Sequence, residues 1–327
     1  MAVTQFAASS ESGAERSANE EAPPKAAPRI TKRIWRANIP LFLLFLPGAL
    51  YYVLFKYMPM GGLIIAFKDY NFADGVFHSP WVGLDNFQTI FRQPQTLNII
   101  RNTVVLSFLN VFVGFPFPIL LAIMLNEVRR SWYKRIIQTV VYLPHFFSWV
   151  IIGGFVITLF SVESGTLNNW IEALTGKPYP FLFNETSWIA IYVGSGIWKE
   201  TGFGAIIYLA ALTGIDPSLY ESASLDGASK FRQIWHITLP GISSTIVIMF
   251  ILAMGRLMEV GFDQVYVLQN SVVSNVADVI STFMYRVGLQ GAQFSLTSAM
   301  GLFESLIGLS LVLTANALAR KFDRGLW

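Results

Sequence analysis

Ionisable side chains interrupt several long apolar segments of this chain of 327 residues, and they are the residues most able to do chemistry there. They are Lys56, Arg101, Lys199, Glu200, Arg256, Glu259, Asp263 and Glu304. Because a charge is costly in lipid, each is expected to face protein groups or water. The spacing of Arg256, Glu259 and Asp263 at i, i+3 and i+7 predicts a row on one helix, in which Arg256 pairs with Glu259 along an interior seam. Direct contact of this row with a substrate is the alternative.

Two further sets of residues have the i, i+3, i+4, i+7 spacing of one helical face. The first set is Gly196, Lys199, Glu200 and Phe203, and the second is Met254, Leu257, Met258 and Gly261. The first face offers a cation, a carboxylate and an aromatic ring. It could contact a solute, or it could pack against a neighbouring helix with an ion pair near Lys199 and Glu200.

The residue types needed for covalent, metal or nucleotide chemistry are absent or wrongly spaced. The chain has no cysteine, and its three histidines, His78, His145 and His236, are too far apart to resemble a metal-ligand motif. Gly176-Lys177 is followed by Pro178 and lacks the earlier glycine of a phosphate-binding loop. We see no nucleophile and base at a credible spacing. We therefore expect no enzyme activity, no metal and no cofactor bound by this chain.

The elements that must position these residues are membrane-spanning helices. Hydrophobic residues make up 54% of the chain and charged residues 13%, with a mean hydropathy of +0.51, whereas a soluble domain is about 25% charged. Apolar segments long enough to span a bilayer lie at 39–66, 99–125, 136–160, 188–212, 240–268 and 296–319. The sequence predicts an all-α polytopic membrane protein with six transmembrane helices over residues 38–327. Residues 1–37 are polar and are expected to form a disordered basic tail.

Lysine and arginine counts in the connections predict the orientation. The tail, the 126–135 loop, the polar stretch after residue 215 and the C-terminal end hold fifteen basic residues, and the other three connections hold four. Because basic residues accumulate on the cytoplasmic side, both termini and the polar stretch are predicted to be cytoplasmic. The accumulation of basic residues on the cytoplasmic side also explains the net charge of +3, so this charge does not indicate nucleic-acid binding. The basic cluster at 29–36 is interpreted as an electrostatic anchor to lipid.

The polar stretch from Ile215 to Ile242 predicts two short helices joined by a turn. Asp216 is suited to cap the first helix and Pro217 to occupy its first position. Gly227 is expected to end it. Ser229 is suited to cap a second short helix that ends before Pro240. We call residues 215–240 the elbow, and its small side chains suit a fit into a partner's cleft.

Within the elbow, Glu221-Ser222-Ala223, three residues, Gly227, nine residues and Ile237-Thr238-Leu239-Pro240 form a spaced pattern. It is similar to the EAA loop of permease subunits in binding-protein-dependent ABC importers, with Ser222 where the motif usually has alanine. The resemblance implies a type I ABC importer permease fold and a coupling helix that docks into a groove on the ATP-hydrolysing subunit. The coupling residues it implies are Glu221, Ser222, Ala223, Asp226, Gly227, Ala228, Leu239 and Pro240.

Several segments outside the elbow carry a second signature. They are 57–60, 66–71, 81–87, 261–264, 278–282, 285–289 and 325–327. These segments resemble the polysaccharide and oligosaccharide branch of sugar permeases, and the resemblance covers essentially everything after residue 37. Many of their aromatic residues are equally typical of interfacial belts. By matching lengths from the elbow, the two helical faces fall where maltose-type permeases, which the chain resembles, line their sugar pocket.

The resemblance implies partners and a location. They are a second, related permease subunit, two ATP-binding subunits that hold ATP and Mg, and an extracytoplasmic solute-binding protein. The expected location of the protein is a bacterial cytoplasmic (inner) membrane.

The expected substrate is an oligosaccharide or polysaccharide. Lys199 on a pathway-facing stripe would attract a carboxylated sugar, which makes alginate-like or pectin-like chains the sharper hypothesis. Neutral oligosaccharides are the alternative. A secondary transporter would need internal repeats and broken helices, and no repeat is evident. A membrane enzyme such as a glycosyltransferase would need a metal or acid–base cluster, and none is spaced that way.

Overall fold

The computed structural model describes residues 32–321, and these residues are almost entirely helical. Within this range the one strand-like pairing is an isolated bridge between Lys68 and Trp81. The chain divides into two compact units, Met1–Gly61 and Gly62–Trp327, which are described separately.

The first unit contains the first apolar helix. Helix α1, Lys32–Tyr52, continues into a π-helical turn η1, Val53–Tyr57. The 3₁₀ segment η2, Met58–Phe67, begins in this unit and ends in the second. Helix α1 already begins at Lys32, so the disordered tail predicted for residues 1–37 is wrong over its last six residues. The rest of that tail lies outside the described residues.

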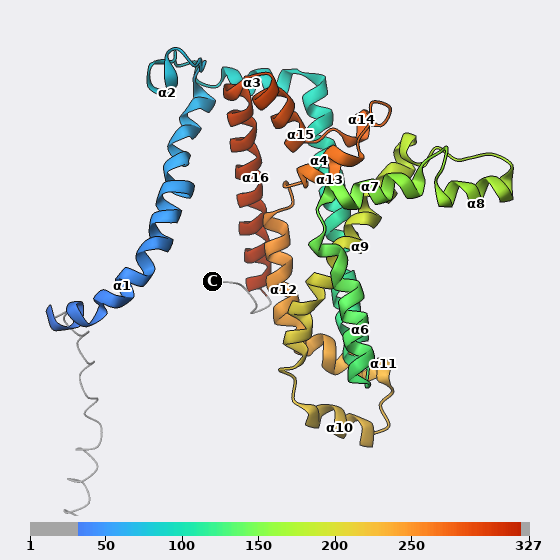
Figure 1. Ribbon diagram of the computed structural model, residues 1–327. Helices are drawn as coiled ribbons and strands as arrows, with labels where there is room; N and C mark the ends of the chain where they lie inside the picture. Colours follow the sequence, from blue (N-terminus) through green and yellow to red (C-terminus); the bar gives the residue numbers. More distant parts are fainter. Residues whose placement is uncertain (1–31, 322–327) are drawn as a thin grey trace, which may run out of the picture. The chain divides into compact units, whose positions relative to one another are not determined.

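The second unit contains the remaining helices (Figure 1). The longer ones are α3 (Asp85–Arg92), α4 (Pro94–Gly114), α5 (Pro116–Glu127), α6 (Ser131–Tyr142), α7 (Trp149–Phe160), α8 (Thr166–Thr175), α9 (Glu185–Leu212), α10 (Pro217–Leu225), α12 (Leu239–Gly255), α13 (Phe262–Leu268) and α16 (Phe294–Arg320). The short ones are α2 (Gly75–His78), η3 (Leu143–Phe146), η4 (Phe181–Phe183), α11 (Lys230–Gln233), η5 (Ile234–Thr238), α14 (Ser274–Ala277), α15 (Ile280–Phe283) and η6 (Met284–Gln290).

Spanning segments agree with the six apolar segments when bent helices are included. Four stretches are long and apolar enough to cross a membrane: Asn38–Phe67, Pro94–Glu127, Lys230–Gly255 and Phe294–Arg320. Two bent pairs raise the number to six: Ser131–Phe146 with Trp149–Phe160, and Glu185–Leu212 with Pro217–Leu225.

Two of the predicted spans are not continuous helices. The segment 136–160 bends by 101° between η3 and α7, where Pro144 lies in the last turn before the break and Ser148 caps α7. The segment 240–268 breaks because α12 ends at Gly255, a poor helix former, and helix resumes only at Phe262. Apolar residues continue through both breaks, so hydropathy alone predicted unbroken spans.

The second arm of the elbow is also not a separate short helix. Helix α11, the π turn η5 and α12 form one helical stretch, Lys230–Gly255, which runs through Pro240. A proline inside a helix removes a hydrogen bond and its ring meets the carbonyl four residues earlier. The wider π turn, Ile234–Thr238, ends two residues before Pro240. It includes His236, the residue four positions before the proline.

Three buried clusters form the interior of the second unit. One lies among α4, α7, α9 and α13, and includes Trp188 and Tyr192. A second joins α3, α4, α12 and α16 around Met258 and Met300. The third joins α5, α9 and α12 around Tyr208 and Ile242. Helix α9 contributes to two of these clusters. It also leads into the elbow and lines the pocket, both of which are described below.

Candidate functional site

The first arm of the elbow has the caps that its sequence predicts. Asp216 Oδ1 accepts a hydrogen bond of 2.9 Å from the Ser218 backbone N–H, and Pro217 is the first residue of α10. This backbone bond lowers the pKa of the Asp216 carboxyl, so the cap is charged at neutral pH. Gly227 has φ +75°, the left-handed conformation that follows a helix end. Ser229 caps α11 through the Arg232 N–H.

Side chains inside the elbow tie its two arms together. The buried Gln233 Nε2 donates to Ser224 Oγ at 2.9 Å, and the Tyr220 and Thr238 hydroxyls are 3.0 Å apart. Lys230 on α11 forms an ion pair of 3.0 Å with Glu127 at the end of α5. The first two contacts hold α10 to the helical stretch that leads into α12, and the ion pair holds that stretch to α5.

The outer surface of the elbow is unusually apolar for a polar stretch. Leu225, at the end of α10, is 90% exposed, and Phe231, which stacks on Trp235, is 74% exposed. The predicted coupling residues Glu221, Ser222, Asp226 and Gly227 are exposed, Ala223 and Ala228 are partly buried, and Leu239 and Pro240 begin α12. Figure 1 shows α10 projecting beyond the ends of the neighbouring helices. Exposed leucine and aromatic side chains of this kind indicate a surface for a protein partner.

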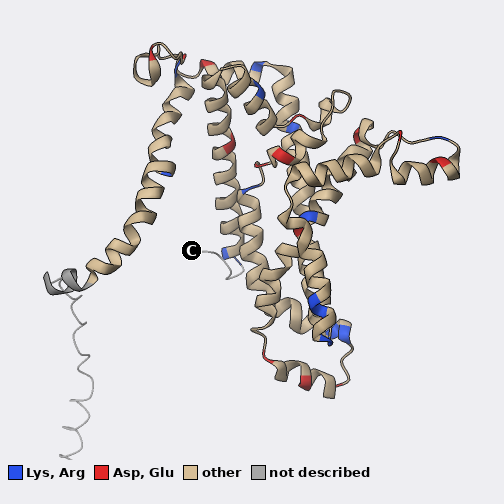
Figure 2. Ribbon diagram, in the orientation of Figure 1, with Lys and Arg blue, Asp and Glu red and all other residues tan. Residues whose placement is uncertain are grey.

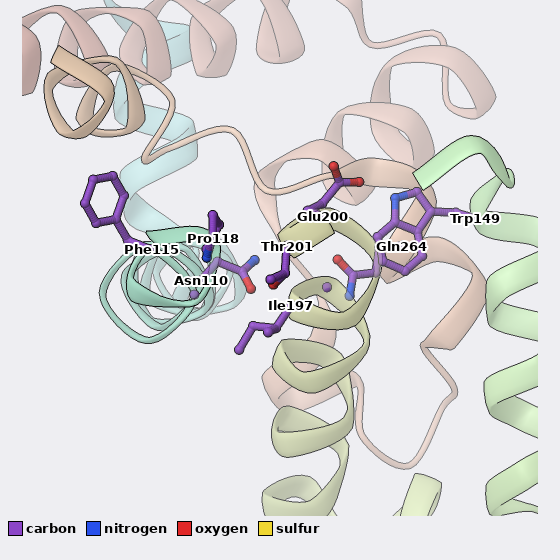
Figure 3. Close-up of a pocket in the computed structure, with 10 residues that line it drawn as sticks. Asn110, Phe115, Pro118, Trp149, Ile197, Glu200, Thr201 and Gln264 are labelled. Atoms are coloured by element: carbon purple, nitrogen blue, oxygen red, sulfur yellow. The ribbon is translucent and has the colours of Figure 1, made fainter. Parts of the chain in front are cut away.

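A second feature is a cavity of about 300 Å³ among the spans, which we call the membrane pocket (Figure 3). Its lining comes from α4, α5, the start of α7, α9 and α13: Asn110, Gly114, Phe115, Pro118, Trp149, Gly196, Ile197, Glu200, Thr201 and Gln264. Asn110 Nδ2 donates to the Tyr192 hydroxyl at 2.9 Å, and Gln264 Nε2 donates to the Tyr192 carbonyl at 2.6 Å. The pocket lining thus includes two aromatic rings, two amides, one hydroxyl and one carboxylate.

The predicted fourth-span face is a true helical face of α9, but only half of it lines the pocket. Gly196 and Glu200 do so, whereas Lys199 and Phe203 do not. Lys199 is 6% exposed; its Nζ donates to the His145 carbonyl at 2.7 Å and lies 3.5 Å from Glu200 Oε1. This geometry matches the alternative that the sequence left open, an ion pair beside Glu200.

The predicted fifth-span face and the charged row do not form helical faces, because α12 ends at Gly255. Met254, Leu257 and Met258 are buried in the α12–α16 cluster, and Gly261 precedes α13. Arg256, Glu259 and Asp263 are exposed, and none of the ion pairs among residues 32–321 joins Arg256 to Glu259. The predicted i, i+3, i+7 geometry is therefore wrong, while any role of these residues in substrate passage stays a prediction.

Of the residues that line the pocket, only Gly196 and Glu200 were among the candidates. Asn110, Trp149 and Gln264 come from three elements that are far apart in sequence. Asn110 did leave a signal, as one of two amide side chains inside the apolar segment 99–125. Trp149 left none, because its position depends on the bend in the third span.

The signature segment 278–289 forms a compact ionic network. Arg286 donates to Asp278 at 2.6 and 3.2 Å, and Thr282 Oγ1 donates to the same carboxylate at 2.7 Å. Asn102 on α4 donates to the backbone carbonyls of Asn275 and Asp278. These residues anchor α14 and α15 to α4. Residues 32–321 contain no cluster of His, Cys, Asp or Glu with metal-site geometry.

Helical spans and an exposed elbow define a polytopic membrane protein with a surface for a partner outside the membrane. Comparison with known families identifies which one. Residues 114–327 match the family described as "Binding-protein-dependent transport system inner membrane component", so the chain belongs to that family. It is the permease of a sugar ABC importer; ATP hydrolysis resides in separate subunits.

The relatives agree over nearly the whole chain. The chain is 46% identical over 282 residues to the polygalacturonan/rhamnogalacturonan transport system permease protein YteP of Bacillus subtilis, covering 86% of this chain and 88% of that one. It is 45% identical over 284 residues to protein LplB of the same organism, covering 87% and 89%. A chain of a bacterial ABC transporter that imports the acidic polysaccharide alginate has a TM-score of 0.82 and 41% identity, over 89% of this chain and 99% of that chain.

Proposed function

We propose that this chain forms one half of the translocation pathway of an ATP-driven importer of oligosaccharides or polysaccharides. A second, related permease would form the other half. Two ATP-binding subunits would hold ATP and Mg, and an extracytoplasmic solute-binding protein would deliver the sugar. The family match and the exposed elbow support this arrangement. A solved structure of the alginate transporter in complex with its periplasmic protein, 41% identical to this chain, supports the binding protein.

The proposed membrane is the bacterial cytoplasmic membrane, with the elbow and both termini on the cytoplasmic side. Figure 2 shows basic residues at α11 and at the beginning of α6, next to the elbow. They include Arg129, Arg130, Lys134, Arg135, Lys230 and Arg232. Basic residues prefer the cytoplasmic side, which is also where ATP-binding subunits would meet α10.

The proposed substrates are acidic, uronate-containing oligosaccharides. The observation that carries this proposal is the similarity above 40% over most of the chain to both an alginate importer and a polygalacturonan permease, two systems whose named polymers are built of uronic acids. Lys199 does not carry it, because its ammonium is enclosed and already bonded to the His145 carbonyl.

The test is the ATPase activity of the purified complex, reconstituted with its binding protein. Oligogalacturonates or alginate oligomers are compared with the methyl esters of the same oligomers, which have the same length but no charge. We expect the acids to stimulate ATP hydrolysis and the esters not to. Equal stimulation by the esters would show that the carboxylates are not recognised, and stimulation by neutral oligosaccharides alone would replace this substrate class.

A further inference from the structure

The third span changes direction by 101° between η3 and α7, and this bend faces helix α9. Carbonyl groups in the last turn of a helix lack partners within that helix. One of them, the carbonyl of His145, accepts a hydrogen bond of 2.7 Å from the buried Lys199 ammonium. The same ammonium lies 5.6 Å from the ring centre of Trp149, the first residue after the bend. Lys199 therefore contacts the chain on both sides of the bend.

The side chain of His145 is held by the same face of α9. Its Nδ1 lies 2.8 Å from Glu200 Oε2, and its ring stacks on Phe203 with 4.0 Å between the ring centres and an angle of 3°. The Glu200 carboxylate also lies 3.5 Å from the Lys199 ammonium, so it contacts both His145 and Lys199. We call His145, Lys199, Glu200 and Phe203 the clasp.

Backbone contact reinforces the clasp on the α6 side only. A Cβ atom added at Gly202 would lie 1.9 Å from the Val141 carbonyl oxygen, so α9 and α6 touch through their backbones just before the bend. Helix α7, after the bend, packs mainly against α13 and α8, and it meets α9 through the rings of Phe155 and Trp198, whose centres are 5.9 Å apart. The two arms of the bent span thus have different main neighbours, and the clasp joins α9 to the turning point between them.

We propose that the clasp positions the bend, so that α9 and α6 move as one body and the bend sets the place of Trp149 in the wall of the membrane pocket. This inference rests on the proposed function, because it links the elbow, through α9, to the proposed translocation pathway. Helix α9 ends at Leu212 and α10 begins four residues later, at Pro217, within the elbow. Trp149 and Glu200 both line the pocket. Lys199 and Glu200 are accordingly positioning residues, and Lys199 is not a ligand of the sugar.

The bend can be measured directly in the assembled complex. Because the chain has no cysteine, a pair of cysteines at the exposed positions Ile136 on α6 and Ile157 on α7 can be spin-labelled for a distance measurement by electron–electron double resonance. Lys199→Met keeps the aliphatic stem and removes the ammonium, and we expect it to shift or broaden the distance distribution. Lys199→Arg keeps a donor and is expected to restore it. The matched control is Lys68→Met, since Lys68 is also buried and donates to two backbone carbonyls, but those carbonyls belong to Val76 and Phe77 in α2 and not to the bent span.

The second readout separates positioning from sugar binding. If the clasp transmits motion, Lys199→Met lowers the maximal sugar-stimulated ATPase rate, by about tenfold for a lost charged hydrogen bond, and leaves the half-saturating sugar concentration nearly unchanged. A sugar ligand would behave in the opposite way.

An unchanged distance distribution in Lys199→Met, or a raised half-saturating concentration with an unchanged maximal rate, overturns the proposal. If that variant does not assemble, His145→Ala with Phe203→Ala removes the stacked rings of the clasp, neither of which lines the pocket, and the same two outcomes decide. Absence of any sugar stimulation in the wild-type complex would refute the proposed function while leaving the bend measurement valid.

Discussion

Replacement of Gly227 by valine should uncouple the elbow without removing any side-chain contact. Gly227 joins α10 to α11 with φ +75°, and a Cβ atom built there would meet no atom within 4 Å. The perturbation is therefore confined to the backbone, because only the left-handed conformation is disfavoured and no steric clash with a neighbour is added.

The magnitude follows from that conformation. A residue with a side chain pays about 1–2 kcal/mol in the left-handed region, and a β-branched one lies at the upper end. This corresponds to about a 5–30-fold shift in population away from the observed turn. Since the turn sets the angle between α10 and α11, we expect sugar-stimulated ATP hydrolysis to fall by a similar factor in a complex that still assembles.

Two matched variants give the assay its controls. Gly176, the residue after α8, also has φ +75° and also has no atom within 4 Å of its Cβ position, so Gly176→Val carries the same backbone cost outside the elbow. Gly227→Asn tolerates the left-handed conformation and should keep coupling. Normal stimulation in Gly227→Val, or equal loss in Gly176→Val, would refute the reasoning, because the effect would then be absent or merely a loss of stability.

Further outcomes can be checked in the same complex. Glu221→Lys reverses an exposed charge on the elbow and should weaken assembly with the ATP-binding subunits, measured by co-purification. A reporter fused at Leu326 should be cytoplasmic and one inserted at Thr175 extracytoplasmic; the opposite labelling would overturn the orientation. Gly202→Ala forces α6 and α9 apart and should destabilise the complex by about 1–3 kcal/mol, seen in thermal unfolding. Gln233→Met removes the buried amide that ties the two arms, and should lower the transport-to-ATPase ratio at normal assembly.

The elbow could be predicted from sequence because its signals are local. Asp216, Gly227 and Ser229 each act on backbone groups within three residues, and all three occupy the predicted roles. The second arm could not be predicted, because proline at 240 usually ends a helix. The helix continues through Pro240 because of the π turn at Ile234–Thr238. A single π turn does not produce a recognisable pattern of residue types, so the sequence does not predict it.

The bends inside the membrane could not be predicted for a different reason. Hydropathy reports how apolar a segment is, and apolar residues continue on both sides of the 101° bend. The pattern around Arg256 failed because it assumed a continuous 3.6-residue period, which Gly255 interrupts. Pocket residues such as Trp149 come together only once those bends are known.

The three charged residues that follow α12 constrain how the chain meets its surroundings. Arg256 and Glu259 lie in the break between α12 and α13, Asp263 lies in the first turn of α13, and all three are exposed and inside the predicted span 240–268. Charges at membrane depth persist where protein or water covers them, and lipid does neither. The face that carries the break therefore needs a neighbour other than lipid: the first unit of this chain, another subunit or an aqueous path. The proposed second permease and translocation pathway would be such neighbours, whereas the ion pair expected between Arg256 and Glu259 does not form within residues 32–321 of the chain.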